Sequence, residues 1–159
     1  MKLTRREFFV KTCQGAAVIA VPTLLSSIIE GCSNNSNPVS NPSSSGLQTI
    51  NASAKNNVIT LTVDSSSPLS AVGSAALIQF SNGNLLIDRS DQNTFNALSA
   101  ICTHQGCLIN YYDSGNKQFV CPCHGSRFGL NGQVVQGPAS RPLSQYQTQF
   151  NNNQLSISV

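Results

Sequence analysis

The chain has 159 residues, of which 9% are charged, 6% are aromatic and none is Trp. This length predicts one folded domain with room for tails. The formal net charge of +3 depends on the N-terminus, because the residues after Cys32 contain five Lys or Arg against four Asp and no Glu. A nucleic-acid surface needs clustered basic side chains. The sequence contains no such cluster, so we exclude a nucleic-acid partner.

The N-terminus has the pattern of an export signal. Paired Arg5 and Arg6 precede a mostly apolar run of about eighteen residues that ends at Ile29, which resembles a twin-arginine signal for folded proteins. A run of this length is also near the lower limit for crossing roughly 30 Å of hydrocarbon, so an uncleaved signal anchor is an alternative. We therefore expect attachment to a bacterial inner membrane through the N-terminus, with the domain on the periplasmic or outer face.

The end of the apolar run resembles a lipoprotein cleavage site. Gly31 precedes Cys32, which would be lipidated, although Glu30 stands where a small residue is usual. Lipidation of Cys32, an uncleaved anchor and simple cleavage all remain open. We predict a signal over residues 1–32 and a flexible linker, rich in Ser, Asn and Pro, over residues 33–57.

Residues 58–159 have the pattern of an all-β domain. From Val58, apolar and polar residues alternate with period two, which is typical of half-buried strands. Turn-forming residues separate further short apolar runs, and no stretch has a helical period. We therefore expect short antiparallel strands and a site built from loops. The predicted strands are 58–63, 75–80, 84–88, 95–101, 108–112, 118–120, 134–135, 143–150 and 155–159.

Two short motifs contain both histidines and four of the six cysteines. Residues 102–107 read C-T-H-Q-G-C and residues 121–126 read C-P-C-H-G-S. Six potential ligands are too many for one tetrahedral ion. A zinc site uses the same residue types, but Cys-x-His and Cys-x-x-His replace the usual Cys-x-x-Cys pairs, extra cysteines occur in both motifs, and the export signal indicates an oxidising compartment.

The two motifs closely resemble those of the Rieske [2Fe–2S] family. The resemblance implies a Rieske-type antiparallel β sandwich or barrel with a loop-built subdomain that binds one [2Fe–2S] cluster. By this resemblance Cys102 and Cys121 bind one iron as thiolates, and His104 and His124 bind the other through imidazole nitrogen. Cys107 and Cys123 resemble the pair that forms a disulfide in the quinol-oxidising branch, which favours an exported respiratory protein.

The ligand set also predicts a high reduction potential. Two neutral imidazoles in place of two thiolates remove negative charge from one iron, and Rieske centres reach about −150 to +300 mV against roughly −400 mV for plant-type clusters. The exposed imidazole nitrogens of the family couple proton loss to electron loss, as quinol oxidation requires. The Gly137-Pro138-Ala139 segment resembles the family's proline-containing loop over the cluster.

Three further residues match positions that adjust the site. Ser126 matches the serine whose hydroxyl donates to a bridging sulfide. Phe128 stands where many high-potential members have Tyr, so we expect a potential lower by roughly some tens of millivolts, suited to a low-potential quinol such as menaquinol. Gln105 stands where an apolar residue is common beside an exposed histidine, which bears on how a quinol headgroup docks.

The resemblance implies one-electron transfer as a subunit of a quinol:cytochrome c reductase-like complex. Quinol, or a quinol-oxidising cytochrome b subunit, would supply the electron, and a c-type cytochrome or copper protein would accept it. Alternatives are the small Rieske subunit of a molybdenum oxidase resembling arsenite oxidase, a stand-alone periplasmic carrier, and a structural role for the cluster. The domain has no acid/base pair or nucleophile, so we expect an electron-transfer subunit rather than a complete enzyme.

Overall fold

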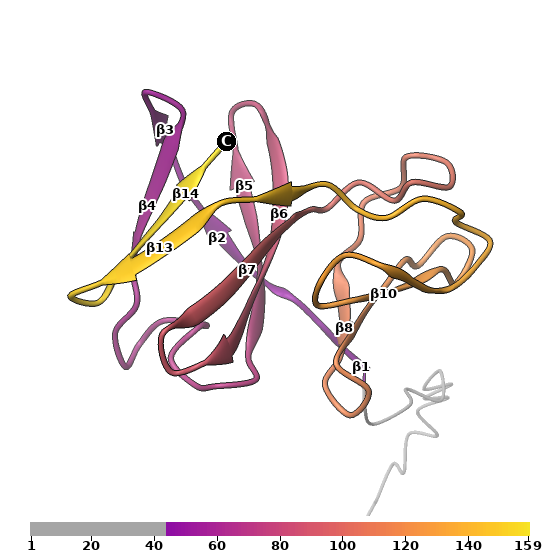
Figure 1. Ribbon diagram of the computed structural model, residues 1–159, viewed down its shortest axis with the longest axis horizontal. Coiled ribbons are helices and arrows are strands. Elements are labelled where there is room, and N and C mark those ends of the chain that lie inside the picture. The colour runs from indigo at the N-terminus through magenta and orange to yellow at the C-terminus, as the bar shows by residue number, and fades with distance from the viewer. Residues whose placement is uncertain (1–43) are drawn as a thin grey trace, which may run out of the picture. The chain divides into compact units, whose positions relative to one another are not determined.

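The computed structural model describes residues 44–159, and every regular element in this part of the chain is a β-strand (Figure 1). The predicted signal over residues 1–32, Cys32 and the first part of the predicted linker lie outside the described residues. Among those described, no helix is long and apolar enough to cross a membrane.

The strands form three sheets. The first, which we name the loop-lobe sheet, has the order β1-β8-β9-β10-β11. All its neighbours are antiparallel. Its strands are only three residues long: β1 Ser44–Gly46, β8 Tyr111–Asp113, β9 Gln118–Val120, β10 Arg127–Gly129 and β11 Val134–Gln136. This sheet, the loops that join its strands and the segments that lead into β8 and out of β11 make up the loop lobe.

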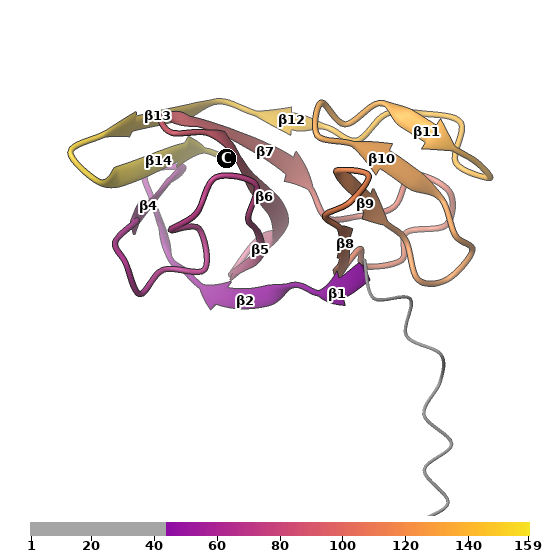
Figure 2. The same cartoon turned by 90° about the horizontal axis from the view of Figure 1, so that it is seen from below.

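The other two sheets form the sandwich, which Figure 2 shows beside the loop lobe. The central sheet has the order β12-β7-β6-β5-β2, with β12 Gln145–Tyr146, β7 Thr94–Ser99, β6 Gly83–Asp91, β5 Ala75–Phe80 and β2 Gln48–Asn51. The outer sheet has the order β13-β14-β4-β3, with β13 Thr148–Asn151, β14 Gln154–Ser158, β4 Val58–Thr62 and β3 Ala54–Lys55.

The central sheet is buried on both faces. Alternate strand residues point to opposite faces, so Ala76 and Ile87 join one core against the outer sheet, whereas Leu77, Leu86 and Leu98 join a second core with the loop lobe. This double burial explains why β5 and β6 read as nearly continuous apolar runs rather than as alternating ones. The second core places the loop lobe against a rigid support.

The predicted linker over residues 33–57 is too long. Residues 44–55 contain β1, β2 and β3, because Leu47, Ile50 and Ala54 pack against the two cores as partly buried side chains. These apolar residues are few and are separated by Ser and Asn, so they do not predict a strand from the local sequence. They form strands because the edge of a sheet lies beside them and pairs with their backbone. We expected antiparallel strands, but β2 pairs in parallel with β5.

The predicted hairpins and strands are otherwise mostly confirmed. Strand β5 matches its prediction, and β13 and β14 form a hairpin with Asn152 and Asn153 at positive φ, the conformation that such two-residue turns require. Predicted strand 143–150 is divided into β12 and β13, because β12 pairs with the central sheet and β13 with the outer one. Predicted strand 108–112 begins only at Tyr111, and β10 was not predicted.

Candidate metal centre

Two loops of the loop lobe have the same backbone frame. In the loop of residues 102–107, the Cys102 N–H donates to the Cys107 carbonyl at 2.8 Å and the Gly106 N–H donates to the Cys102 carbonyl at 2.9 Å. In the loop of residues 121–126, the equivalent bonds from Cys121 and Gly125 measure 2.9 and 3.0 Å. Gly106 and Gly125 both have positive φ, 75° and 74°, which explains glycine in the fifth position of both motifs.

This frame turns the first cysteine of each loop inward. Cys102 and Cys121 are free thiols with 2% and 1% exposure, in a core that also contains Phe119 and Phe128. The pKa of the Cys121 thiol is raised, first by burial and then by its contact with the Cys102 thiol. Two adjacent buried thiols without a counter-charge are costly to ionise, and a bound metal removes that cost.

The two histidines meet beside these thiols. The rings of His104 and His124 lie edge to face with their centroids 4.8 Å apart, although the residues come from different loops. His124 is exposed, whereas His104 is half-buried and its Nδ1 atom is buried without a hydrogen-bond partner among the described residues. A buried polar atom without a partner costs about 1–3 kcal/mol. Coordination to a metal would satisfy it, so the residues present fit an iron–sulfur group.

The remaining two cysteines are bonded to each other. The disulfide Cys107–Cys123 joins the two loops with its Cα atoms 6.5 Å apart, as the family resemblance implies. The Cys121 sulfur lies within 4.8 Å of both disulfide sulfurs, but bonded sulfurs cannot serve as thiolate ligands. The disulfide thus leaves two thiols and two imidazoles as the donor set.

A third segment is tied to both loops. The buried Ser126 Oγ accepts a hydrogen bond from the Ala139 N–H at 3.0 Å, and the Thr103 hydroxyl donates to the Arg141 carbonyl at 2.6 Å. The segment begins with a cis peptide bond between Gly137 and Pro138. Because Ser126 accepts this bond, its own hydrogen remains available as a donor. The contact of Thr103 was not predicted, since no local pattern indicates a partner so far along the chain.

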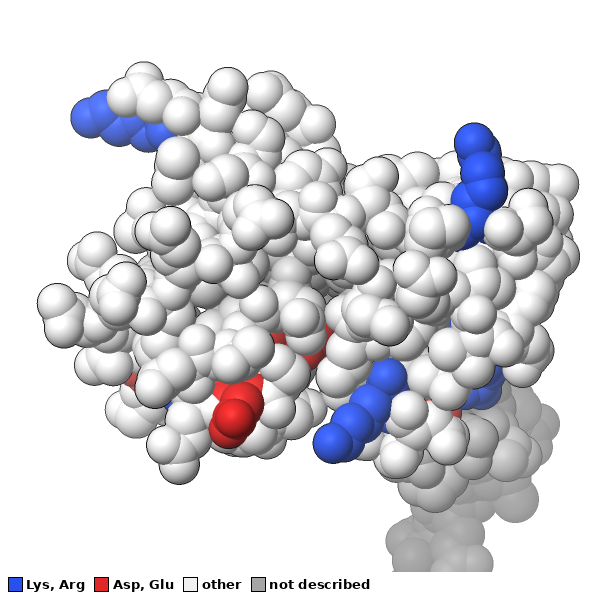
Figure 3. Space-filling model, viewed as in Figure 1, with Lys and Arg blue, Asp and Glu red and all other residues white. Residues whose placement is uncertain are grey.

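The two other predicted positions lie at the edges of the site. Phe128 has 0% exposure and packs in the same core as the two thiols. Gln105 is exposed beside His104. Figure 3 shows that charged side chains are few and isolated on the face in view.

An ion pair supports the sheet behind the loops. Arg127 Nη1 lies 2.9 Å from Asp113 Oδ2, whose carboxylate also accepts hydrogen bonds from Asn116. These bonds, those from Asn116 first, lower the pKa of Asp113 to about 2. Asp113 therefore remains ionised at neutral pH and joins β8, the following turn and β10.

A set of two thiols and two imidazoles suits either zinc or a mixed-ligand iron–sulfur centre. Comparison with known families decides between them, because the profile of the Rieske [2Fe–2S] domain matches residues 60–147. The chain belongs to the Rieske [2Fe–2S] domain family. Its cofactor is therefore one [2Fe–2S] cluster, and the zinc alternative is set aside.

The named relatives are iron-sulfur subunits of cytochrome b6-f complexes. The chain is 36% identical over 102 residues to the cytochrome b6-f complex iron-sulfur subunit of Chlorobaculum thiosulfatiphilum, covering 64% of this chain and 55% of that protein. It is 44% identical over 75 residues to the subunit of the same name from Prochlorococcus marinus strain AS9601, covering 45% of this chain and 40% of that one. The chain thus spans about half the length of the curated relatives it matches.

Solved structures agree on the fold. A cyanobacterial plasma membrane Rieske protein from Synechocystis PCC 6803 matches with a TM-score of 0.53 and 32% identity, covering 62% of this chain and 99% of that one. The ferredoxin of carbazole 1,9a-dioxygenase from Nocardioides aromaticivorans IC177 has a TM-score of 0.51 at 18% identity, covering 62% of this chain and 96% of that one. At that identity the match shows the fold alone.

Proposed function

We propose that this Rieske protein is the one-electron carrier of a quinol-oxidising membrane complex. The observation that carries the proposal is the donor set: two buried thiols beside two imidazoles, one of them exposed, in loops joined by a disulfide. When bound, the cluster supplies reversible uptake and release of one electron at high potential.

In this proposal Cys102 and Cys121 hold one iron and His104 and His124 hold the other. The residues of the chain position and shield these ligands. The matched backbone frames orient the two cysteines inward, and the 137–141 segment is tied to both loops by Ser126 and Thr103. Burial of both thiols excludes water from the cysteine side, whereas exposed His124 leaves the histidine side accessible to an electron donor.

The relatives support a proposal about the partners. Relatives named as iron-sulfur subunits of cytochrome b6-f complexes support a cytochrome b subunit as the partner at which quinol is oxidised. We propose a c-type cytochrome or copper protein as the acceptor and attachment to the membrane through the N-terminus. Twin-arginine export, the periplasmic or outer-face orientation and lipidation of Cys32 remain predictions. None of the relatives named above is a molybdenum oxidase subunit, so that alternative has no specific support.

The proposal is tested first on the cluster itself. The full chain, produced with iron and sulfide, should show a reversible one-electron wave in voltammetry and the electron paramagnetic resonance signal of a reduced, mixed-ligand [2Fe–2S] centre. His124→Cys should keep a cluster but lower the potential by hundreds of millivolts, toward the all-cysteine range. An unchanged potential in a variant that still holds its cluster would contradict the ligand assignment.

The partner is tested separately. Affinity purification of the native protein from membranes should recover a b-type cytochrome, and adding menaquinol to this complex should reduce the cluster. A complex without b-type haem, or a cluster that quinol does not reduce, would overturn the quinol role. In that event the voltammetry would still identify an electron carrier.

A further inference from the structure

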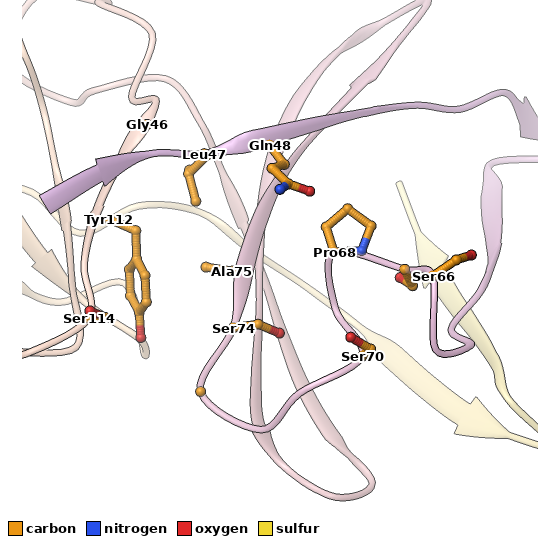
Figure 4. Close-up of a pocket in the computed structure, with 12 residues that line it drawn as sticks. Gly46, Leu47, Gln48, Ser66, Pro68, Ser70, Ser74, Ala75, Tyr112 and Ser114 are labelled. Atoms are coloured by element: carbon orange, nitrogen blue, oxygen red, sulfur yellow. The ribbon is translucent and has the colours of Figure 1, made fainter.

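A polar pocket opens where the loop lobe meets the sandwich (Figure 4), with a volume of about 560 Å³. This volume lies within the range of small-molecule sites, roughly 300–1,000 Å³. The pocket is lined by Gly46, Leu47, Gln48, Ser66, Ser67, Pro68, Ser70, Gly73, Ser74, Ala75, Tyr112 and Ser114. None of these residues belongs to the proposed iron ligands or to the loops that carry them.

One wall is a long connection that is tied by hydrogen bonds to neighbouring residues. It runs from Val63 to Ser74 between β4 and β5, about a dozen residues, and ordered connections of that length are often functional. The Asp64 carboxylate accepts hydrogen bonds from the Ser66 N–H at 2.8 Å and from its hydroxyl at 2.6 Å. The Arg89 guanidinium donates to the Ser70 carbonyl at 2.6 Å, so a ligand would find this wall already ordered.

Four of the seven polar side chains that line the pocket are free to bind a ligand. Figure 4 shows Tyr112 and Ser114 on one side and Pro68, Ser66 and Ser70 across from them. The hydroxyls of Ser66, Ser67 and Ser74 are engaged in hydrogen bonds. Within residues 44–159, the side chains of Gln48, Ser70, Tyr112 and Ser114 make none. Hydroxyl groups both donate and accept, so the pocket offers an alternating set of donors and acceptors.

The lining carries no formal charge. Arg89 points its guanidinium at backbone carbonyls and lies over the rings of Phe95 and Phe150. The pKa of Tyr112 is raised by burial and then by the negative charges of Asp88 and Asp113, so its hydroxyl remains a donor. A charged ligand would lose hydration here without gaining a counter-ion in the lining.

We propose that this pocket binds a small neutral polyol of about monosaccharide size. Each ligand hydroxyl would both donate and accept, which matches the hydroxyl and amide groups of the lining. Leu47, Pro68 and Ala75 provide apolar surface for the C–H face of such a molecule. The ligand could be a free sugar or the sugar headgroup of a membrane lipid, since both present the same chemistry.

Equilibrium dialysis of the full chain with its cluster, using labelled glucose, glucosamine and glucuronate, tests the class of ligand. Glucose should bind in the millimolar range and more tightly than either charged analogue. No binding of glucose, in solution or as glucosyl diacylglycerol in phosphatidylcholine vesicles, would overturn the proposal, as would equal binding of the three. Binding only to glucosyl vesicles would identify a lipid headgroup as the source.

Matched variants test the location. Tyr112→Phe keeps the ring and removes the hydroxyl, so the dissociation constant for glucose should rise about three- to tenfold. Tyr111→Phe is the control, because Tyr111 is exposed and does not line the pocket. Ser114→Ala, at an exposed position, should weaken binding similarly even if Tyr112→Phe disturbs the core. Unchanged affinity in both pocket variants would place the binding elsewhere.

Discussion

The sandwich and the loop lobe are stabilised in different ways. The sandwich contains strands of up to nine residues and a core of aliphatic side chains between paired sheets. The loop lobe has strands of three residues and relies on a disulfide, an ion pair and side-chain bonds between loops. Regular pairing and its core thus stabilise the sandwich, whereas the loop lobe combines a shared core with cross-links between short strands and loops. Conditions that remove cross-links or metal should therefore affect the two regions differently.

The largest difference should follow loss of the cluster. If the proposed ligands hold the cluster, the apo protein leaves two buried thiols and His104 Nδ1 without a partner among the described residues, and metal binding contributes directly to folding of such a site. Hydrogen exchange should increase at least about tenfold in residues 102–107 and 121–126, and much less in β5 and β6. An equal increase of hydrogen exchange in both regions would show that the sandwich does not stay folded independently of the site loops.

Removing the disulfide should have the next largest effect. The bond closes a sequence separation of 16, for which chain entropy suggests a loss of about 3 kcal/mol. The double variant Cys107→Ser, Cys123→Ser should therefore lose its visible cluster absorption at lower urea than the wild type. Dithiothreitol serves as the control, because it should lower the midpoint of the wild type only. Identical urea midpoints for the two proteins would contradict a stabilising role for the bond.

Replacing either of two buried aspartates should change the free energy of unfolding less, and the two changes should depend on pH in opposite directions. Burial raises the pKa of Asp88 to about 6, and its Oδ1 has no partner among the described residues. The carboxyl therefore destabilises the fold increasingly as the pH rises from its usual pKa, 3.8, through about 6. Asp88→Asn should raise the free energy of unfolding by up to about 3 kcal/mol at pH 8 and by little at pH 4.

Asp113 has the reverse dependence. Its lowered pKa stabilises the fold above pH 3.8, and this contribution is lost as the pH falls toward about 2. Asp113→Asn should therefore destabilise the protein at pH 7 and much less at pH 2.5, as measured by urea unfolding. If the two variants gave parallel pH profiles, the assigned environments would be wrong.

The smallest expected effect is on the potential. Phe128 is fully buried beside the two thiols, and a tyrosine hydroxyl there would donate toward a sulfur and stabilise the reduced state. Phe128→Tyr should raise the midpoint potential by roughly some tens of millivolts in voltammetry. Phe119→Tyr, in the same core but outside the motifs, is the matched control and should change it less. An unchanged or lower midpoint potential for Phe128→Tyr would contradict the assignment of position 128 as one that adjusts the potential.

Much of the scaffold was predictable because its signal is local. The alternation from Val58 and the apolar run of Ala75–Phe80 each predict a strand from adjacent residues alone. Prediction failed where partners decide the structure. Residues 44–55 look like linker until β5, β8 and β4 pair with them. Residues 143–150 look like one strand until two sheets divide them.

The sequence by itself determined the types of ligand, their spacing and, through resemblance, the family. The resemblance also predicted which cysteines remain free, and the tertiary structure confirms it, since Cys107 and Cys123 meet across two loops. Only the tertiary structure decided the contacts of Thr103 and Ser126 with the 137–141 segment, and the pocket beside Tyr112. The physical reason is the same in each case. These contacts join residues far apart in the chain, and neither periodicity nor motif spacing records which distant backbone lies opposite a side chain.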